Sequence, residues 1–132
     1  MHLLLVVNPT ASSVTPEIRA AIADALSVRH DVEVAETSAR GHATTLARAA
    51  THDAIDAVVV LAGDGTLNEA AQGLAGTHTA LVALPGGSTN VFARTLGIAH
   101  DPLDACARTR WSIPRGARPA RCASRPGPGP PR

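Results

Sequence analysis

Three short segments of this sequence combine glycine with hydroxyl and amide side chains, the residue types that can bind phosphate without a lysine. They are residues 8–13, 63–69 and 85–90. Glycine lets backbone N–H groups approach an anion closely, and Ser, Thr and Asn side chains add donors. The chain contains no lysine, which excludes a Walker A site. Each segment alone is equally compatible with a tight strand-to-helix turn, but the three together predict a polyphosphate site.

Asp64 is an acidic residue between two glycines of the second segment. A carboxylate repels phosphate unless a divalent cation lies between them, so we expect Asp64 to orient a Mg–nucleotide or to bind a substrate hydroxyl. A plain turn or N-cap is the structural alternative. Glu69 follows Thr66 at capping-box spacing, so a role in a cap and a role in the site both stay open for it.

The elements that must position these segments alternate between strand and helix. Continuous apolar runs are typical of strands buried on both faces, and Thr15-Pro16 predicts the start of a helix. In the second helix, Leu46, Ala49 and Ala50 are expected to face the core. The expected strands are 3–7, 31–36, 56–61 and 80–84, and the expected helices are about 16–29, 42–51, 67–75 and 90–96.

This alternation predicts an α/β fold: a three-layer, Rossmann-like nucleotide-binding lobe with a mostly parallel sheet. Ligands of such sheets bind where loops leave the carboxyl ends of the strands. The three glycine-containing segments follow the first, third and fourth expected strands. We therefore expect them to meet at one edge of the sheet.

Composition narrows the class of protein further. Aromatic residues are only 2% of the chain, so the core must consist of Ala, Val, Leu and Ile. No apolar run approaches the ~20 residues that span a bilayer, and the first residues do not form a signal-peptide pattern. Cys106 and Cys122 match no metal or disulfide pattern. We expect a cytoplasmic protein whose contact with a membrane, if any, is peripheral.

Charge divides the chain into two parts. Residues 1–104 carry all 11 acidic residues and five arginines, whereas residues 105–132 carry seven arginines and no acid. Residues 114–132 are mostly Pro, Arg and Gly, which cannot bury enough apolar surface to become ordered. We expect a lobe at 1–104 and a tail at 105–132 that is disordered or translated out of frame. A basic arm for nucleic acid or anionic lipid is disfavoured, because no aromatic or amphipathic pattern accompanies the arginines.

The motifs together resemble the catalytic domain of the diacylglycerol kinase and sphingosine kinase family, especially the bacterial soluble lipid kinases. The resemblance covers about residues 1–100, the N-terminal lobe only. It rests on Asn8-Pro9, on Thr37 with Gly41-His42-Ala43, and on the motifs at 63–69 and 85–94. A lone GDGT also occurs in NAD kinases and phosphofructokinases, but the following Asn68-Glu69 favours the lipid kinases.

The resemblance implies a lobe that binds ATP with Mg²⁺ and transfers a phosphoryl group to a lipid hydroxyl, such as that of diacylglycerol at a membrane surface. Asp64 is the implied catalytic residue. Ala62 replaces the first glycine of the usual GGDGT, and Val91 stands where many members have Asp. The implied ATP site comprises Asn8, Pro9, Thr10, Ala11, Ser12, Thr37, Ala62, Gly63, Asp64, Gly65, Thr66, Leu67, Asn68 and Thr89.

Members of this family continue into a β-rich second lobe that supplies the catalytic base, a structural magnesium site and much of the lipid pocket. The residues after Pro102 resemble none of that lobe. We therefore expect no catalytic base, no metal ligand and no nucleic-acid partner in this chain. The expected function is a truncated lipid kinase, and the alternative is a non-catalytic nucleotide-binding fragment. A redox dinucleotide-binding domain is disfavoured, because Asn8-Pro9 rather than GxGxxG follows the first strand.

Overall fold

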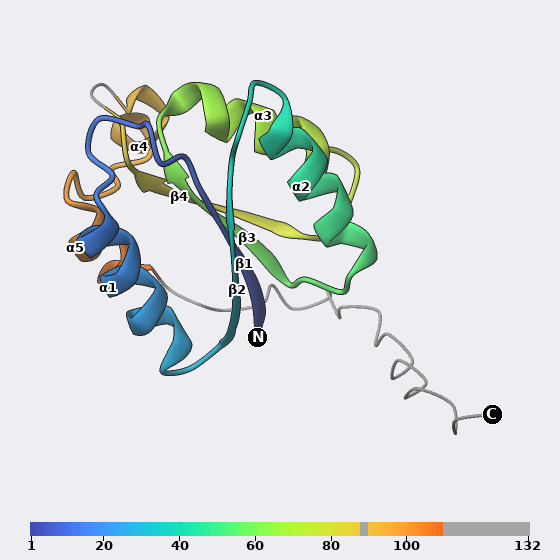
Figure 1. Cartoon of the computed structure of the whole chain (residues 1–132), viewed down its shortest axis with the longest axis horizontal. Coiled ribbons are helices and arrows are strands. Elements are labelled where there is room, and N and C mark those ends of the chain that lie inside the picture. Colours follow the sequence, from blue (N-terminus) through green and yellow to red (C-terminus); the bar gives the residue numbers. More distant parts are fainter. Residues whose placement is uncertain (88–89, 110–132) are drawn as a thin grey trace.

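A fully parallel sheet of four strands, in the order β2-β1-β3-β4, forms the centre of the computed structural model, which describes residues 1–87 and 90–109 (Figure 1). The elements along the chain are β1 (His2–Val7), α1 (Pro16–Ser27), β2 (Asp31–Glu36), α2 (His42–His52), β3 (Ala57–Ala62), α3 (Asp64–Leu74), β4 (Ala80–Pro85), α4 (Val91–Thr95) and α5 (Pro102–Arg108). The predicted α/β class and the parallel sheet are confirmed. Among the residues described, no helix has both the length and the apolar character needed to cross a membrane.

The two central strands are apolar on both faces, and this determines their place in the sheet. Every residue of β3 is buried, as is every residue of β1 after His2. The neighbouring β2 carries Asp31, Glu33 and Glu36, and its Val34 is 41% exposed. Acidic side chains on an edge strand oppose pairing with another molecule, so β2 is suited to the edge and β1 and β3 to the centre.

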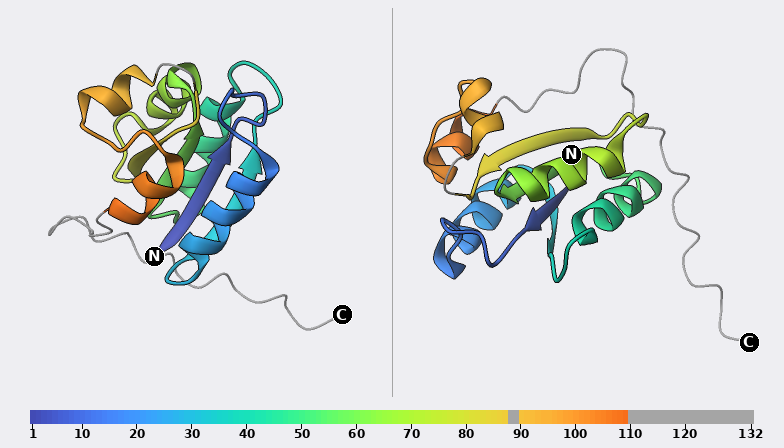
Figure 2. Two further views of the ribbon diagram at one scale, coloured as in Figure 1. Left: turned by 90° about the vertical axis from the view of Figure 1, so that its left-hand side faces the viewer. Right: turned by 90° about the horizontal axis from the view of Figure 1, so that it is seen from above.

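Two apolar clusters lie on opposite faces of the sheet, and together with it they make three layers. Val58 and Val60 face the cluster covered by α2 and α3, whereas Val59 and Leu61 face the cluster that includes residues of α1 and α5. Figure 1 shows the two helix pairs on opposite sides of the strands, and the left view of Figure 2 shows α1 and α5 side by side. The alternation follows from the two-residue period of a strand.

The helices α2 and α3 approach each other closely because small residues lie between them. The buried residues of α2 are Ala43, Ala47 and Ala50. The prediction for this face was right for Ala50, only partly right for Leu46, which is half-buried, and wrong for Ala49, which is exposed. The buried set recurs every three to four residues, and this period places Ala49 on the solvent side of the helix.

α3 begins earlier than its sequence pattern predicts. The expected start at residue 67 is wrong, because Asp64 already has helical structure and Gly63 is the N-cap with extended backbone. Thr66 therefore lies inside the first turn and is not an N-cap, so the capping box with Glu69 does not form. Other boundaries differ by smaller amounts: α1 ends at Ser27, and α4 spans only Val91–Thr95.

Helical structure continues beyond the predicted boundary at residue 104, since α5 runs to Arg108. The Asp101 carboxylate accepts a hydrogen bond from Leu103 N at 3.0 Å, and Pro102 occupies the first turn. Ala105 and Cys106 are buried in the cluster shared with α1, and burial raises the pKa of the Cys106 thiol. Residues 105–109 thus belong to the lobe; the prediction of disorder for residues 110–132 lies outside the described residues.

The contact between α2 and α3 predicts opposite effects for two glycine substitutions in α3. A Cβ atom at Gly73 would lie 2.5 Å from Thr44 O and 2.9 Å from the Ala47 Cβ, whereas a Cβ at Gly65 would meet no atom within 4 Å. We expect Gly73→Ala to lower the free energy of unfolding by about 1–3 kcal/mol through overpacking. Gly65→Ala should raise it by about 0.5–1 kcal/mol, because alanine favours helix. Urea denaturation of both variants distinguishes these outcomes, and equal shifts would contradict the close contact.

The burial of α5 predicts that it stabilises the whole lobe. Ala105 is 3% exposed, whereas Ala107 on the same helix is exposed. Ala105→Glu would bury an unpaired carboxylate and should lower the free energy of unfolding by at least about 2 kcal/mol. Ala107→Glu is the matched control and should change it by less than about 0.5 kcal/mol. Similar thermal melting of the two variants would show that α5 does not pack as described.

Candidate functional site

The loops that follow the strands meet at the carboxyl edge of the sheet, near α4 in the upper part of Figure 1. Asn8 N, just after β1, donates to Leu61 O of β3 at 3.2 Å, and Thr37 N, just after β2, donates to Val7 O at 2.9 Å. The loop after β1 also reaches the segment after β4, because Ser13 N donates to Gly86 O at 2.9 Å. The structure therefore brings together segments that the sequence placed at one edge.

The Asn8 side chain connects the first loop to the start of α3. Its Nδ2 donates to Thr66 Oγ1 at 3.3 Å. Its Oδ1 accepts from Thr10 N at 3.0 Å and from Thr10 Oγ1 at 2.8 Å, the pattern of an Asx turn. Asn8 thus holds the loop 8–12 against the first turn of α3.

The N-terminus of α3 is open toward this edge. Its N-cap is Gly63, which has no side chain to accept a hydrogen bond from the first turn. Gly65 is exposed, and a Cβ built on it meets nothing within 4 Å. The N–H groups at the start of a helix, together with the helix dipole, favour an anion. This helix end offers both the donors and the space for a phosphate.

Asp64 lies at the junction of α3 and α4. Its Oδ2 accepts a hydrogen bond from Val91 N, the first residue of α4, at 2.8 Å. The carboxylate therefore holds the two helix N-termini together as well as adding negative charge at the edge. Within residues 1–87 and 90–109, no three His, Cys, Asp or Glu side chains gather as a metal site.

The segment after β4 lies close to the segment after β3. A Cβ atom on Gly86 would lie 2.8 Å from Ala62 N, and one on Gly87 would lie 2.8 Å from Gly63 Cα. Real side chains do not tolerate such distances, so glycine is required at both positions. Ala62 itself is buried at 5% exposure, which shows that the alanine replacing the usual glycine packs within the lobe.

Asn90 ends the third glycine-containing segment but is not among the residues of the implied ATP site. It is 4% exposed, and its carboxamide makes two hydrogen bonds to Gly87: Oδ1 accepts from Gly87 N at 2.9 Å, and Nδ2 donates to Gly87 O at 2.6 Å. The adjacent PGG turn was the signal that could have identified it, because an Asn three residues after a turn glycine can close that turn with its side chain.

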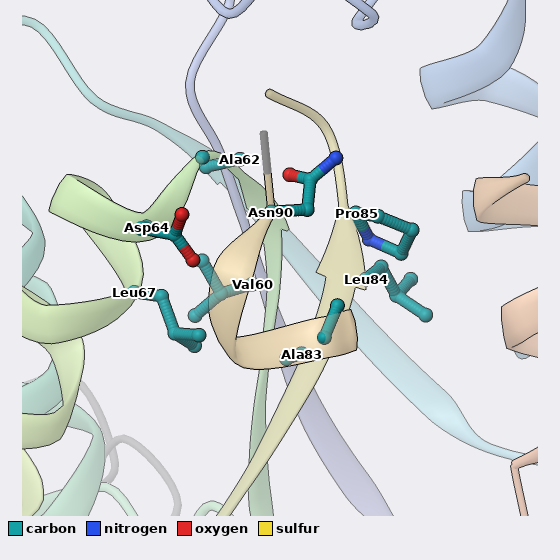
Figure 3. Close-up of a pocket in the computed structure, with 10 residues that line it drawn as sticks. Val60, Ala62, Asp64, Leu67, Ala83, Leu84, Pro85 and Asn90 are labelled. Atoms are coloured by element: carbon teal, nitrogen blue, oxygen red, sulfur yellow. The ribbon is translucent and has the colours of Figure 1, made fainter. Parts of the chain in front are cut away.

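A small hollow lies beneath Asp64 and Asn90, between α3, α4 and the ends of β3 and β4 (Figure 3). Its other lining residues are mainly apolar, and Val60, Leu67, Ala83 and Leu84 are among them. A water-sized sphere can occupy only about 10 Å³ of it, roughly the space of one water molecule. The hollow is therefore too small to hold a nucleotide.

The residues of the predicted ATP site occupy different environments. The predicted residues that are exposed or half-buried at this edge are Asn8, Pro9, Thr10, Ala11, Ser12, Thr37, Gly63, Asp64, Gly65, Thr66 and Asn68. Ala62 and Leu67 are buried, and Leu67 N donates to Gly63 O. Thr89 lies outside the described residues. His42 Nδ1 accepts a hydrogen bond from Ser38 N at 2.9 Å, which connects the first residue of α2 to the segment after β2.

Comparison with known proteins identifies relatives of this lobe. Residues 2–121 match the family described as the diacylglycerol kinase catalytic domain. The chain is 36% identical over 108 residues to a probable YegS-like lipid kinase of Chromohalobacter salexigens, an alignment that covers 79% of this chain and 35% of that protein. It is 42% identical over 77 residues to a diacylglycerol kinase of Bacillus subtilis, covering 52% of this chain and 25% of the relative.

Solved structures give the same result for the fold. A diacylglycerol kinase structure from Bacillus anthracis superposes with a TM-score of 0.72 at 31% sequence identity, covering 80% of this chain and 38% of that one. The chain thus spans about a third of the length of the proteins it matches. The family match over most of the chain and the shared fold show that this chain belongs to the diacylglycerol kinase catalytic domain family.

Proposed function

We propose that this lobe binds the phosphates of ATP at the carboxyl edge of its sheet and serves as the nucleotide-binding part of a lipid kinase. The observation that carries this proposal is the open N-terminus of α3, which lies between the loop held by Asn8 and the turn at Gly86 and Gly87. A helix N-terminus bordered by two small-residue loops suits a chain of phosphates.

Each part of this edge has a distinct role in the proposal. The N–H groups at Gly65 and Thr66 face the phosphates, with the open space above Gly65 leaving room for their oxygens. Ser12 adds an exposed hydroxyl donor, whereas the Thr10 hydroxyl already donates to Asn8 Oδ1 and shapes the loop. Thr37, which extends the pairing of β2 with β1, borders the site on the side away from β4.

Asp64 and Mg²⁺ have linked roles in the proposed transfer. Bound Mg²⁺ would neutralise charge on the phosphates and hold them in a fixed geometry. A single carboxylate beside the phosphates suits a magnesium ion that keeps its phosphate and water ligands. Asp64 would orient this ion or the acceptor hydroxyl while it retains its hydrogen bond to Val91 N.

The acceptor side of the reaction is proposed from the relatives, which are named as diacylglycerol kinases or lipid kinases. A nucleotide-binding lobe that does not transfer phosphate alone is the second candidate. It is favoured by the coverage of the relatives, because the chain spans about a third of their length.

ATP binding can be tested with a substitution that fills the open space without disturbing the packing. Gly65→Val should fold, because no atom lies within 4 Å of a Cβ at this position, but its side chain would occupy the space of the phosphates. We expect at least a tenfold rise in the Kd for Mg–ATP, about 1.4 kcal/mol, by titration calorimetry. Thr66→Val, which removes the hydroxyl next to Asn8, should weaken binding as well.

The control for these variants is Thr51→Val, at the far end of α2 from this edge, where the Thr51 hydroxyl bonds only to Arg48 O among the bonds described. Its Kd should equal that of the unaltered protein. A folded protein that binds no Mg–ATP would refute the proposed function, and unchanged binding by Gly65→Val would place the nucleotide elsewhere.

Phosphoryl transfer is the second test. Because the chain spans about a third of its relatives, we expect it to bind ATP alone but to phosphorylate diacylglycerol only when joined to the remaining part of a relative. A missing general base alone costs roughly 10²–10⁴-fold in rate. An assay with labelled ATP and diacylglycerol micelles measures the rate of phosphoryl transfer by the chain alone and by the joined protein. Asp64→Asn should abolish the activity of the joined protein. Activity of the 132-residue chain alone at a comparable rate would contradict the expectation.

A further inference from the structure

Asn90, the residue before α4, combines three properties that its position before a helix does not require. It is the one polar residue found buried in the described part of the chain, at 4% exposure. Its backbone has φ 47°, in the left-handed region that non-glycine residues seldom adopt. Both polar atoms of its carboxamide are bonded to the same residue, Gly87. The side chain therefore holds the backbone of Gly87 at a fixed position relative to Asn90.

The residue held by Asn90 is the one that touches the start of α3. A Cβ on Gly87 would lie 2.8 Å from Gly63 Cα, so the two backbones are in direct contact. Gly63 is the N-cap of α3, and the next residue, Asp64, accepts a hydrogen bond from Val91 N. Because Val91 follows Asn90 in the chain, these contacts close a ring through Asn90, Gly87, Gly63, Asp64 and Val91. Figure 3 shows the Asp64 side chain at the start of α3 and the Asn90 side chain just before α4.

We propose that Asn90 is a positioning residue: its buried carboxamide holds Gly87 against Gly63 and so sets the position of the α3 N-terminus at which the nucleotide phosphates bind. The proposal rests on the proposed ATP site but assigns Asn90 no contact with the nucleotide. It acts through Gly87 and Gly63.

The chemistry of the side chain explains why an amide suits this position. A carboxamide presents one acceptor and one donor, which match Gly87 N–H and Gly87 C=O. An ionised carboxylate of the same shape only accepts, so it would face the Gly87 carbonyl oxygen without a proton between them. A protonated carboxyl group again offers one donor and one acceptor. Asn90→Asp should therefore lose the contact when ionised and regain it when protonated.

The surroundings favour the neutral form of an acid at position 90. Burial disfavours the charged form. The charged residues of the elements around it are Asp64 and Glu69 on α3 and Arg94 on α4, with none on β3 or β4. The Asp64 carboxylate, bonded to the next residue of the chain, adds repulsion. We expect the pKa of the introduced Asp to be raised into a range that can be titrated without unfolding the protein.

The experiment measures Mg–ATP binding by the full 132-residue chain as a function of pH, at a temperature at which every variant is folded. Its variants are Asn90→Asp, Asn90→Gly and the matched control Gln72→Glu, which makes the same amide-to-acid change at an exposed position of α3. At pH 8, Asn90→Asp should bind at least tenfold more weakly than the unaltered chain. The difference should shrink as the pH falls through the raised pKa of the new carboxyl group.

Asn90→Gly should show a similar loss at every pH, since glycine suits the left-handed backbone but makes neither side-chain bond. Gln72→Glu should match the unaltered chain throughout, which corrects for the titration of ATP itself. A role confined to stability would lower the melting temperature of Asn90→Asp but leave the Kd of the folded protein equal to that of the control. Equal Kd values for Asn90→Asp and Gln72→Glu at pH 8 would overturn the proposal.

A second measurement needs no nucleotide and separates this proposal from the proposed function. The amide signals of Gly63 and Asp64 in ¹H–¹⁵N spectra should move with pH in Asn90→Asp and stay in place in Gln72→Glu. If the unaltered chain binds no ATP, the proposed function fails. The Gly63 and Asp64 signals then still test whether residue 90 sets the position of the α3 N-terminus. Gly63 and Asp64 signals that are insensitive to the ionisation of residue 90 would show that Asn90 does not set the position of α3.

Discussion

The close approach of two backbones at the carboxyl edge, Gly87 against Gly63, is the contact on which the rest of this edge depends. The strands β3 and β4 are hydrogen-bonded neighbours, and both lead directly into segments that begin helices. A side chain on Gly86 or Gly87 would push these segments apart, because its Cβ would lie 2.8 Å from the backbone after β3. With that separation, Asp64 could not reach Val91 N, and Ser13 N would lose its acceptor at Gly86 O. One steric condition thus positions the loops after three strands.

The same use of small residues explains how a chain with 2% aromatic residues forms a closed lobe. Without large rings to fill space between layers, the helices must lie near one another, and α2 meets α3 through Ala43, Ala47 and Gly73. The sheet supplies most of the larger aliphatic side chains, among them Leu3, Leu5, Val59 and Leu61. Close packing of small residues leaves little freedom for the helices to shift. The N-terminus of α3 is therefore held in place by the packing of the whole helix on α2 as well as by the contact with Gly87.

The sequence predicted the features that depend on apolar pattern, and it failed where a side chain or a short helix decides the structure. The apolar runs at β1 and β3 predicted buried parallel strands, because a strand at the centre of a covered sheet must be apolar on both of its faces. The start of α3 was missed because glycines read as loop, although Gly63 with extended backbone can precede a helix directly. α5 was missed because a helix of seven residues is too short to show a clear apolar periodicity. Asp101 and Pro102 nevertheless form a typical helix start. The role proposed for Asn90 depends on the tertiary contact between Gly87 and Gly63, which no local pattern contains.

The proposed phosphate site contains no lysine, so it depends on geometry more than on net charge. The described residues at this edge offer backbone dipoles and hydroxyl groups, and Asp64 adds a negative charge. A point charge attracts an anion over a distance near the ~10 Å Debye length at 0.1 M salt, whereas N–H donors act only within hydrogen-bond range. A displacement of α3 by a fraction of the hydrogen-bond range would therefore weaken anion binding at such a site more than at a site that contains a lysine. This is a physical reason for a buried amide, two glycines in contact and a carboxylate bonded to backbone to converge on one helix end: the donors are weak individually, so their positions must be fixed before the ligand arrives.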